Sequence, residues 1–272
     1  CFAKPGGATP RPCPAPKAGR PAQPEATANH TRCCMERHRP HDITVQIAGC
    51  RDLEEAQSLA RSGVDWIGFP LRLDVHREDT TEEEARRIVA RLPAHTHAIL
   101  ITYLDRAEEV ADFAGFLGVA AVQLHGPIAH RELDRLRSLA PGLRVIKSLV
   151  LGAPESRDPI GLVHRFAPHV DGFITDTYYP ATGARGATGK THDWRIARDI
   201  VRASPKPVIL AGGLTPDNVA AAVRAVRPAG IDCHTGVERP DGSKDPELVR
   251  AFCERGRDAG ATCRCRFAQI MV

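Results

Sequence analysis

Between His41 and Asp258, short apolar and β-branched runs alternate eight times with amphipathic helical runs. Several of the short runs are apolar almost throughout, which is typical of parallel strands covered by helices. Eight βα units in one unbroken series favour a closed TIM (β/α)8 barrel of the α/β class over an open sheet. An open doubly wound sheet would more often contain about five or six units and a glycine fingerprint after its first strand. This chain instead has Ala48-Gly49-Cys50-Arg51 there.

The alternation predicts the position of each element. Helix starts are indicated where an Asp or Thr that can cap the helix is followed by a proline suited to its first turn. This occurs at Asp158-Pro159, Thr215-Pro216 and Asp245-Pro246. The expected strands are 43–49, 66–71, 98–103, 121–124, 145–149, 172–176, 208–211 and 231–235. The expected helices are 52–62, 80–92, 106–117, 128–139, 159–166, 194–203, 216–226 and 246–255.

The domain organisation follows from where this pattern begins and ends. We expect one barrel domain over residues 41–258, a size that a single barrel accommodates. Residues 1–40 are rich in Pro, Ala, Gly and Arg without hydrophobic periodicity, so they are expected to form a disordered tail. Met35 precedes the periodic pattern and is expected to be the natural start. Residues 259–272 lose periodicity and are expected to form a C-terminal tail.

Charge and cysteine usage exclude several functional classes. The net charge of +4 is mild and no basic stripe is interleaved with aromatic residues, so no nucleic-acid partner is expected. No apolar run approaches the roughly 18 residues of a membrane span, and the chain begins without the apolar region of a secretory signal. Of nine cysteines, only Cys50, Cys233 and Cys253 fall in the barrel segment. Such a scattered, odd set predicts reduced thiols in the cytoplasm and no metal site.

In barrels of this class, the chemistry lies at the carboxyl ends of the strands. Asp176 stands at the end of the sixth expected strand, before a segment rich in Gly and Thr that is suited to a mobile lid. A carboxylic acid in a lidded pocket can have its pKa raised enough to donate a proton near neutrality. Asp176 is therefore predicted to be a catalytic acid.

A phosphate site is predicted after the seventh and eighth strands. Gly212 and Gly213 follow the seventh strand, and Thr235 and Gly236 follow the eighth. These two loops are the usual phosphate cradle of such barrels, because bare glycine amides and a helix N-terminus can hold a phosphate. The expected ligand is a small phosphorylated substrate.

At these residues the sequence resembles the phosphoribosylanthranilate isomerases, a family of tryptophan-pathway barrels. The resemblance spans roughly residues 43–255 and implies an Amadori rearrangement of an aminoaldose phosphate to an aminoketose, without metal or organic cofactor. The segments that carry it are 121–126 (AVQLHG), 145–147 (VIK), 186–194 (GATGKTHDW), 207–214 (PVILAGGL), 228–232 (PAGID), 236–238 (GVE) and 244–248 (KDPEL).

The resemblance also implies roles for individual residues. Asp176 occupies the position of the family's general acid, and Gly212, Gly213 and Gly236 match its phosphate cradle. Four further residues are implied to bind substrate. Arg77 stands where the family carries an arginine on the anthranilate side, although its flanking residues differ; Asp232 matches the acid that ends the eighth strand; His125 and Lys147 match family positions.

One departure from the family pattern concerns the reaction itself. The family's general base is a cysteine in a K-I-C-G segment, and this chain has Gln46-Ile47-Ala48-Gly49. A methyl group cannot accept a proton, and the loss of a positioned base typically costs about 10²–10⁴-fold in rate. The serine pair before Gly236 has also become His234-Thr235. Two residues are candidates for a relocated base: Cys50, just beyond the empty position, and His234, on a strand that borders the first.

Three hypotheses remain open. The chain is an isomerase of this family with a relocated base, or a relative that acts on a different phosphorylated substrate, or a non-catalytic barrel that binds a sugar phosphate. The retained Asp176 and its lid disfavour the third, since a binding protein has little use for a proton donor under a lid. The sequence does not distinguish a monomer from a homodimer.

Overall fold

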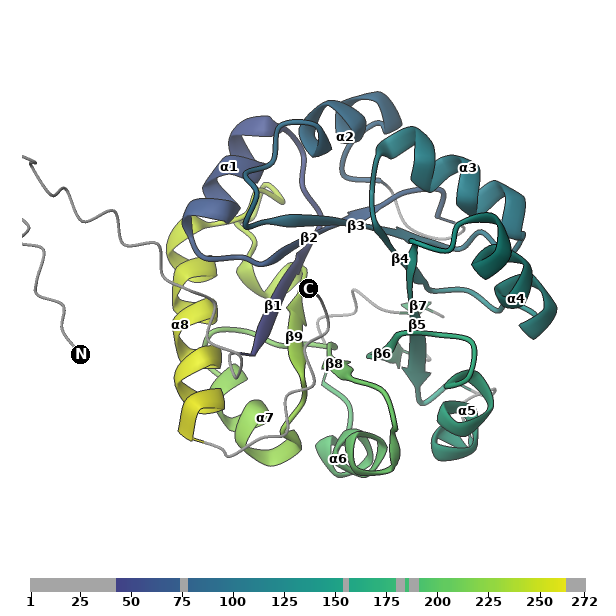
Figure 1. Cartoon of the computed structure of the whole chain (residues 1–272). Coiled ribbons are helices and arrows are strands. Elements are labelled where there is room, and N and C mark those ends of the chain that lie inside the picture. Colours follow the sequence, from purple (N-terminus) through teal and green to yellow (C-terminus); the bar gives the residue numbers. More distant parts are fainter. Residues whose placement is uncertain (1–42, 74–77, 154–156, 180–183, 186–190, 263–272) are drawn as a thin grey trace, which may run out of the picture. The chain divides into compact units, whose positions relative to one another are not determined.

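Eight parallel strands close into a barrel in the computed structural model, which describes residues 43–73, 78–153, 157–179, 184–185 and 191–262 (Figure 1). The strands pair in the order β5-β4-β3-β2-β1-β9-β8-β6, and a β5–β6 pairing closes the ring. The parallel strands are β1 (Thr44–Ala48), β2 (Trp66–Pro70), β3 (His97–Thr102), β4 (Ala121–Leu124), β5 (Arg144–Leu151), β6 (Gly172–Tyr179), β8 (Val208–Leu210) and β9 (Gly230–Cys233).

The helices lie outside the strands and alternate with them along the chain (Figure 1). The predicted TIM-barrel fold is therefore confirmed. The helices are α1 (Leu53–Arg61), α2 (Glu82–Val89), α3 (Ala107–Leu117), α4 (His130–Leu139), α5 (Pro159–Phe166), α6 (Trp194–Ala203), α7 (Val219–Val226) and α8 (Pro246–Thr262), with a short 3-10 helix η2 (Thr235–Val237). None of these described helices has the length and apolar character needed to cross a bilayer.

Most strands bury both faces, and successive side chains alternate between the two. Outward side chains join a large core between the strands and the helices, to which Val45, Ile47, Val145 and Phe173 belong. Inward side chains form a smaller core inside the barrel: Trp66, Ile99, Ala121, Ile146, Ile174, Ile209 and Ala211. This alternation decides which side chains on each strand can reach a site at the barrel mouth.

The start of α7 differs from the prediction. The helix begins at Val219 rather than at Pro216. Asn218 Oδ1 accepts a hydrogen bond from Thr215 N at 2.9 Å, and its Nδ2 donates to Gly213 O at 2.9 Å. Residues 216–218 therefore form a turn before the helix, in which Thr215 O accepts hydrogen bonds from Asn218 N at 3.2 Å and Val219 N at 3.0 Å.

The end of α8 also differs, since the helix continues past Arg255 to Thr262. Small residues explain why the periodicity was not visible. A Cβ on Gly256 would lie 2.4 Å from Ile231 Cδ1, so the absence of a side chain lets α8 pack closely against β9. Ala259, further along the same helix, is buried as well. The first four residues of the predicted C-terminal tail, 259–262, thus belong to α8. The predicted N-terminal tail, 1–40, and residues 263–272 lie outside the described residues.

Strand β6 continues beyond Asp176, where its end was predicted, to Tyr179. Its last residues leave the barrel: Tyr178 and Tyr179 pair antiparallel with β7 (Ala184–Arg185). The parallel pairing of β6 with β8 has already ended at Thr175. Asp176 therefore lies where β6 rises out of the barrel wall, which is the level of the site.

Candidate active site

Asp176 points into the barrel, two residues after the inward Ile174, and its side chain is 14% exposed. Thr177 N donates a hydrogen bond to Asp176 Oδ1 at 2.7 Å. Burial raises the pKa of Asp176 to about 7, although the Thr177 amide acts in the opposite direction. At neutral pH the carboxyl group is thus close to half protonated, which suits a group that gives up and regains a proton.

His125 lies beside this carboxyl group, with Nε2 4.0 Å from Asp176 Oδ2. Its Nδ1 is 3.0 Å from Ser148 Oγ, and its ring meets the Tyr103 ring edge-on at 5.1 Å. The imidazole is therefore held from two sides at the barrel mouth. This placement is compatible with the predicted substrate-binding role of His125, which remains a prediction.

A row of polar side chains links opposite parts of the barrel below these residues. Gln46 Nε2 of β1 donates to Gln123 Oε1 of β4 at 3.1 Å, and Gln123 Nε2 donates to Ser148 Oγ of β5 at 3.4 Å. All three side chains are buried. Gln123 and Ser148 each follow an inward residue of the apolar core by two positions, so this row separates that core from the site.

Asp232 of β9 also points inward, because its neighbours Ile231 and Cys233 belong to the outer core. Burial raises the pKa of Asp232 to about 7, and the charge of Asp176 adds to the effect, while a hydrogen bond from Gln46 opposes it. The charge of Asp176 thus disfavours ionisation of Asp232. Both side chains point into the barrel.

Ala48 is the last residue of β1 and points into the barrel, because the preceding Ile47 belongs to the outer core. It is 6% exposed and pairs with Gly68 of β2. The residue that departs from the family pattern therefore lies on the inner wall of the barrel, two positions after Gln46. Its methyl group leaves this place without a proton acceptor of its own.

The predicted phosphate cradle is formed by two loops in close contact. Gly212 and Gly213 have φ angles of +99° and +62°, a left-handed conformation that favours glycine. A Cβ on Gly236 would lie 2.0 Å from Leu214 O, so the two loops approach each other only because Gly236 has no side chain. Cys233 Sγ also donates to Leu214 O, at 3.1 Å. Thr235 is exposed at the start of η2.

Replacing Gly236 by alanine is expected to disrupt this contact. Because the new Cβ would meet a backbone carbonyl rather than a flexible side chain, one of the two loops must shift. We expect a loss of about 1–3 kcal/mol in the free energy of unfolding and a higher KM for the phosphorylated substrate. Denaturant unfolding and steady-state kinetics measure both.

The matched control is Gly115→Ala, since a Cβ on Gly115 of α3 meets nothing within 4 Å. In an exposed helix this change is expected to be neutral or to stabilise by roughly 0.5–1 kcal/mol. Equal effects of the two substitutions would contradict the assigned role of Gly236.

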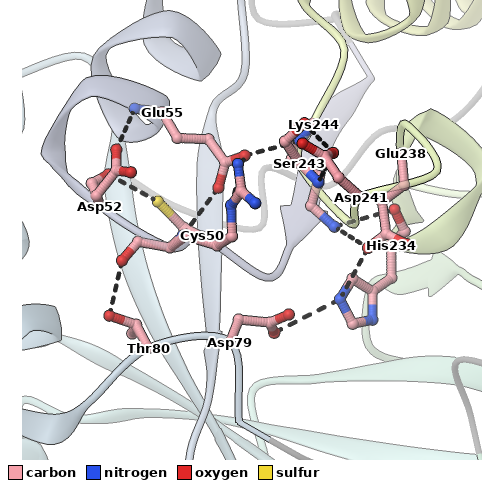
Figure 2. A network of polar contacts seen from close by, with 11 residues as sticks. Cys50, Asp52, Glu55, Asp79, Thr80, His234, Glu238, Asp241, Ser243 and Lys244 are labelled. Carbon is pink, nitrogen blue, oxygen red and sulfur yellow. Dashed lines mark hydrogen bonds and ion pairs between the residues drawn. The ribbon is translucent and has the colours of Figure 1, made fainter.

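His234 follows β9 and lies next to the loop that carries Gly49 (Figure 2). Its Nε2 is 3.5 Å from Asp79 Oδ2 and 3.4 Å from Glu238 Oε1. Lys244 Nζ donates to Glu238 Oε1 at 2.7 Å and to His234 O at 3.1 Å. An imidazole flanked by two carboxylates thus stands at the mouth of the barrel beside β1, where sequence reasoning anticipated a relocated base.

Cys50, the other candidate for a base, is directed away from the barrel interior. Its side chain belongs to the core between strands and helices, and Sγ donates to Asp52 O at 3.4 Å (Figure 2). Burial, together with the charge of Glu55, raises the pKa of the Cys50 thiol. Both its direction and its protonation disfavour Cys50 as the base.

Lys147 was expected to bind substrate, but the structure places its side chain elsewhere. It lies between the inward residues Ile146 and Ser148 of β5, so its side chain points towards the helices. Its Nζ donates to Leu124 O, Gly126 O and Ser148 O at 3.0–3.2 Å. Burial lowers the pKa of the ammonium group to about 8. Lys147 therefore holds the β4–α4 loop on both sides of His125 instead of facing the site.

Two other predicted features lie outside the described residues: Arg77 and most of the lid. Arg72, at the end of β2, is described and points outward. Its guanidinium group donates to Glu82 at 2.8 and 3.1 Å and stacks on Phe113 of α3 at 3.7 Å. These contacts give Arg72 a structural role on the barrel exterior.

Sequence reasoning missed the partners of several site residues. Thr177 Oγ1 lies 3.0 Å from His192 Nδ1, which links β6 to the residue pair that precedes α6. A Cβ on Gly212 would be 2.3 Å from Thr177 Oγ1, so the same contact explains the glycine. Asp79 was not singled out either. Its only sequence signal was that the residues flanking Arg77 differ from the family pattern.

No group of three His, Cys, Asp or Glu side chains is arranged to hold a metal ion within the part of the chain that the structure describes. The acidic groups at the barrel mouth are instead paired with His125, His234, Lys244 and Gln46. The arrangement that the described residues offer is one of proton donors and acceptors beside a glycine-lined cradle.

Comparison with known proteins identifies relatives over the whole barrel. A family model described as N-(5'phosphoribosyl)anthranilate (PRA) isomerase matches residues 45–255. An N-(5'-phosphoribosyl)anthranilate isomerase 2 from Methanosarcina mazei is 35% identical over 220 residues, covering 79% of this chain and 95% of the relative. An N-(5'-phosphoribosyl)anthranilate isomerase from Haloferax volcanii is 37% identical over 217 residues, covering 79% and 93%.

Solved structures agree with these relatives. This chain superimposes with a TM-score of 0.65, at 26% identity, on a structure of the phosphoribosylanthranilate isomerase from Thermotoga maritima. That structure shows monomers generated from the dimeric enzyme. The match covers 79% of this chain and 99% of that one. The likeness therefore extends over the complete barrel and includes the strand ends that carry the candidate site.

Proposed function

Because the chain belongs to the PRA isomerase family, we propose that it converts N-(5'-phosphoribosyl)anthranilate to its aminoketose isomer by an Amadori rearrangement, a step of tryptophan biosynthesis. The observation that carries this proposal is Asp176, a buried carboxyl group with a pKa of about 7 on the inner face of β6. Its position and protonation suit the acid that this reaction requires.

In the first step, Asp176 donates its proton to the ring oxygen of the ribose. The bond between C1 and the ring oxygen breaks, and the nitrogen lone pair forms a C1–N double bond. A base then removes the proton from C2, and the electron pair of the C–H bond forms a C1–C2 double bond while the iminium nitrogen regains its lone pair. Proton return to C1 and loss of the O2 proton yield the ketone, so the product is an isomer of the substrate.

His234 is the described residue best suited to take the C2 proton. The imidazole is half-buried at the barrel mouth beside β1, and histidine titrates in the range that a base requires. Asp232 and His125 flank the acid and are proposed to bind the sugar hydroxyl groups and the amine. Backbone amides at Gly212, Gly213, Thr235 and Gly236 are proposed to hold the phosphate.

A different phosphorylated substrate is the second candidate, and one observation favours it. Ala48 places a methyl group on the inner barrel wall where the family carries its base. The part of the site that removes the proton from C2 of the substrate has therefore changed. The acid and the glycine cradle serve either substrate. Turnover of freshly generated phosphoribosylanthranilate, followed by its fluorescence, distinguishes the two functions.

We expect the wild-type protein to turn over this substrate and His234→Ala to lose about 10²–10⁴-fold in kcat. Ala48→Cys in the His234→Ala background tests whether a thiol at the family position restores the reaction. An inert wild-type protein that gains activity through Ala48→Cys alone would show that the present substrate is another one. Inactivity of all these variants would contradict the isomerase assignment.

A location and an oligomeric state are proposed from the free cysteines and from one relative. Cys50, Cys233 and Cys253 are free thiols in the structure, which supports a cytoplasmic location. The Thermotoga maritima relative is dimeric, and monomers of it have been obtained. A homodimer or a monomer is accordingly proposed for this chain, and sedimentation measures which one forms.

A further inference from the structure

Two departures from the family pattern meet in space. His234 replaces the first residue of a serine pair after β9, and Asp79 belongs to the segment before α2 that differs from the family's. The two residues are distant in sequence, yet His234 Nε2 is 3.5 Å from Asp79 Oδ2 (Figure 2). They meet beside Gly49, the residue that directly follows Ala48. The loss of the base and the appearance of a histidine–carboxylate pair therefore occur at the same place.

Gly49 provides the room for this pair. A Cβ at Gly49 would lie 2.5 Å from His234 Nε2 and 2.9 Å from Asp79 Oδ2, and its φ of +81° favours glycine. The imidazole and the carboxylate thus pack directly against the backbone of the β1–α1 loop. This contact fixes the ring relative to β1, the strand that carries Ala48.

The two ring nitrogens of His234 have different surroundings. Nε2 is buried, lies 3.5 Å from Asp79 and 3.4 Å from Glu238, and makes an electrostatic contact with them rather than a hydrogen bond. Nδ1 makes no hydrogen bond with any residue that the structure describes, and it is not among the buried polar atoms without a partner, so it is accessible. An N–H at Nε2, on the side of the carboxylates, leaves the lone pair on Nδ1, the nitrogen that is not fully buried.

Charges around the ring favour Asp79 as the effective partner. Lys244 Nζ lies 2.7 Å from Glu238 Oε1 and compensates the charge of Glu238. Burial acts to raise the pKa of Asp79, but the adjacent His234, together with Lys244 and Arg51, lowers it overall. Asp79 is thus ionised at neutral pH. The charged groups that face the ring are Asp79, Glu238, Lys244 and, through Asp79, Arg51.

We propose that Asp79 is the positioning residue of a His234–Asp79 pair that replaces the missing cysteine as the base of the reaction. Asp79 and Glu238 hold the proton on Nε2, and Nδ1 accepts the proton from C2 of the substrate. The C–H electron pair moves into the C1–C2 bond, and the resulting imidazolium is stabilised by the Asp79 carboxylate. This inference rests on the proposed isomerase function.

The test replaces Asp79 by asparagine, which keeps the shape and removes the charge. We expect kcat to fall roughly 10- to 100-fold, a part of the 10²–10⁴ that a positioned base contributes, with little change in KM. The acidic limb of the pH–rate profile is expected to move to lower pH, because removing an anion favours the neutral imidazole. Asp79→Glu is expected to recover part of the rate.

The control is Asp241→Asn, the same substitution in the same network. Asp241 accepts hydrogen bonds from Ser243 N at 2.9 Å and from Ser243 Oγ, and has no contact with His234 among the described residues (Figure 2). It is expected to keep the wild-type kcat and pH profile. Wild-type kinetics and an unchanged pH profile in Asp79→Asn would overturn the proposal, as would an equal loss in Asp241→Asn.

A second readout needs no substrate. The imidazole resonance of His234, assigned by its absence in His234→Gln, is titrated by NMR in the wild-type protein and in Asp79→Asn. A lower midpoint in Asp79→Asn supports the pair, and an unchanged midpoint overturns it. Failure of the wild-type protein to turn over phosphoribosylanthranilate would instead overturn the proposed function, and the titration would still decide whether Asp79 controls the imidazole.

Discussion

Replacing Asp176 by asparagine is expected to lower kcat for phosphoribosylanthranilate by about 10²–10⁴-fold, the usual contribution of a positioned acid. The amide keeps the size of the carboxyl group and can still accept the hydrogen bond from Thr177 N, but it has no acidic proton for the ribose ring oxygen. Binding is expected to change little, so the loss appears in kcat more than in KM. Steady-state fluorescence kinetics measure it.

The pH dependence of the wild-type enzyme follows from the same group. Because the pKa of Asp176 is raised to about 7, the protonated acid is lost as the pH rises through 7, and kcat/KM is expected to fall on that side. Asp134→Asn is a suitable control, since Asp134 lies on the exterior beside His169. Retention of wild-type kcat by Asp176→Asn, or an equal loss in Asp134→Asn, would rule out Asp176 as the acid.

The second large effect concerns stability. The pKa values of both Asp176 and Asp232 are raised to about 7 in the folded protein, against 3.8 as the ordinary value. Between pH 4 and 7 the folded state therefore binds more protons than the unfolded state, and stability falls as the pH rises through this window. Above pH 7 the folded protein retains carboxylates in a site that disfavours their charge.

Asp232→Asn is accordingly expected to stabilise the protein above pH 7, by on the order of 1–2 kcal/mol. This is a part of the roughly 4 kcal/mol that the shift from 3.8 to about 7 represents at about 1.4 kcal/mol per pKa unit, because the amide that replaces the carboxylate is itself a polar group in a buried site. This corresponds to a rise of roughly 2–8 °C in Tm. At pH 4 to 5, where the folded carboxyl group is already protonated, the difference should shrink. Thermal unfolding at several pH values measures it, with Asp134→Asn as control. A stabilisation independent of pH would show that the charge of Asp232 is not its origin.

This instability has a functional reason. A carboxyl group exposed to water would have an ordinary pKa and would be ionised at neutral pH, so it would be a poor proton donor. Burial of Asp176 and Asp232 therefore costs stability, and it keeps the proton of Asp176 available near neutrality. The apolar core formed by the inward residues beneath the polar row contributes compensating stability without taking part in the chemistry.

The fold was largely predictable from the sequence, for a local reason. Each βα unit contains its own signals: an apolar run for a strand buried on both faces, and a capped amphipathic run for the helix that covers it. Helices α5 and α6 begin and end at the predicted residues. The sites at the strand ends followed from the same pattern, because in a parallel barrel all carboxyl ends lie on one face.

Which residues surround each site residue could be seen only in the closed barrel. Lys147 and Asp176 lie on the neighbouring strands β5 and β6, and alternation along these strands turns the first side chain outward and the second inward. Cys50 was placed near the vacant base position by sequence distance, whereas its side chain faces the helix layer.

The amino-acid sequence by itself determined the barrel, the position of Asp176 and the glycine loops, and the vacancy at Ala48, because these depend on local pattern and residue type. The tertiary structure alone brought Asp79 against His234, and it placed Asp176 and Asp232 where the charge of the first disfavours ionisation of the second. Asp79 and His234 lie far apart in the chain and become neighbours because β9 pairs with β1 and β1 pairs with β2. Their proton chemistry depends on burial and on neighbouring charge, which are properties of the folded barrel.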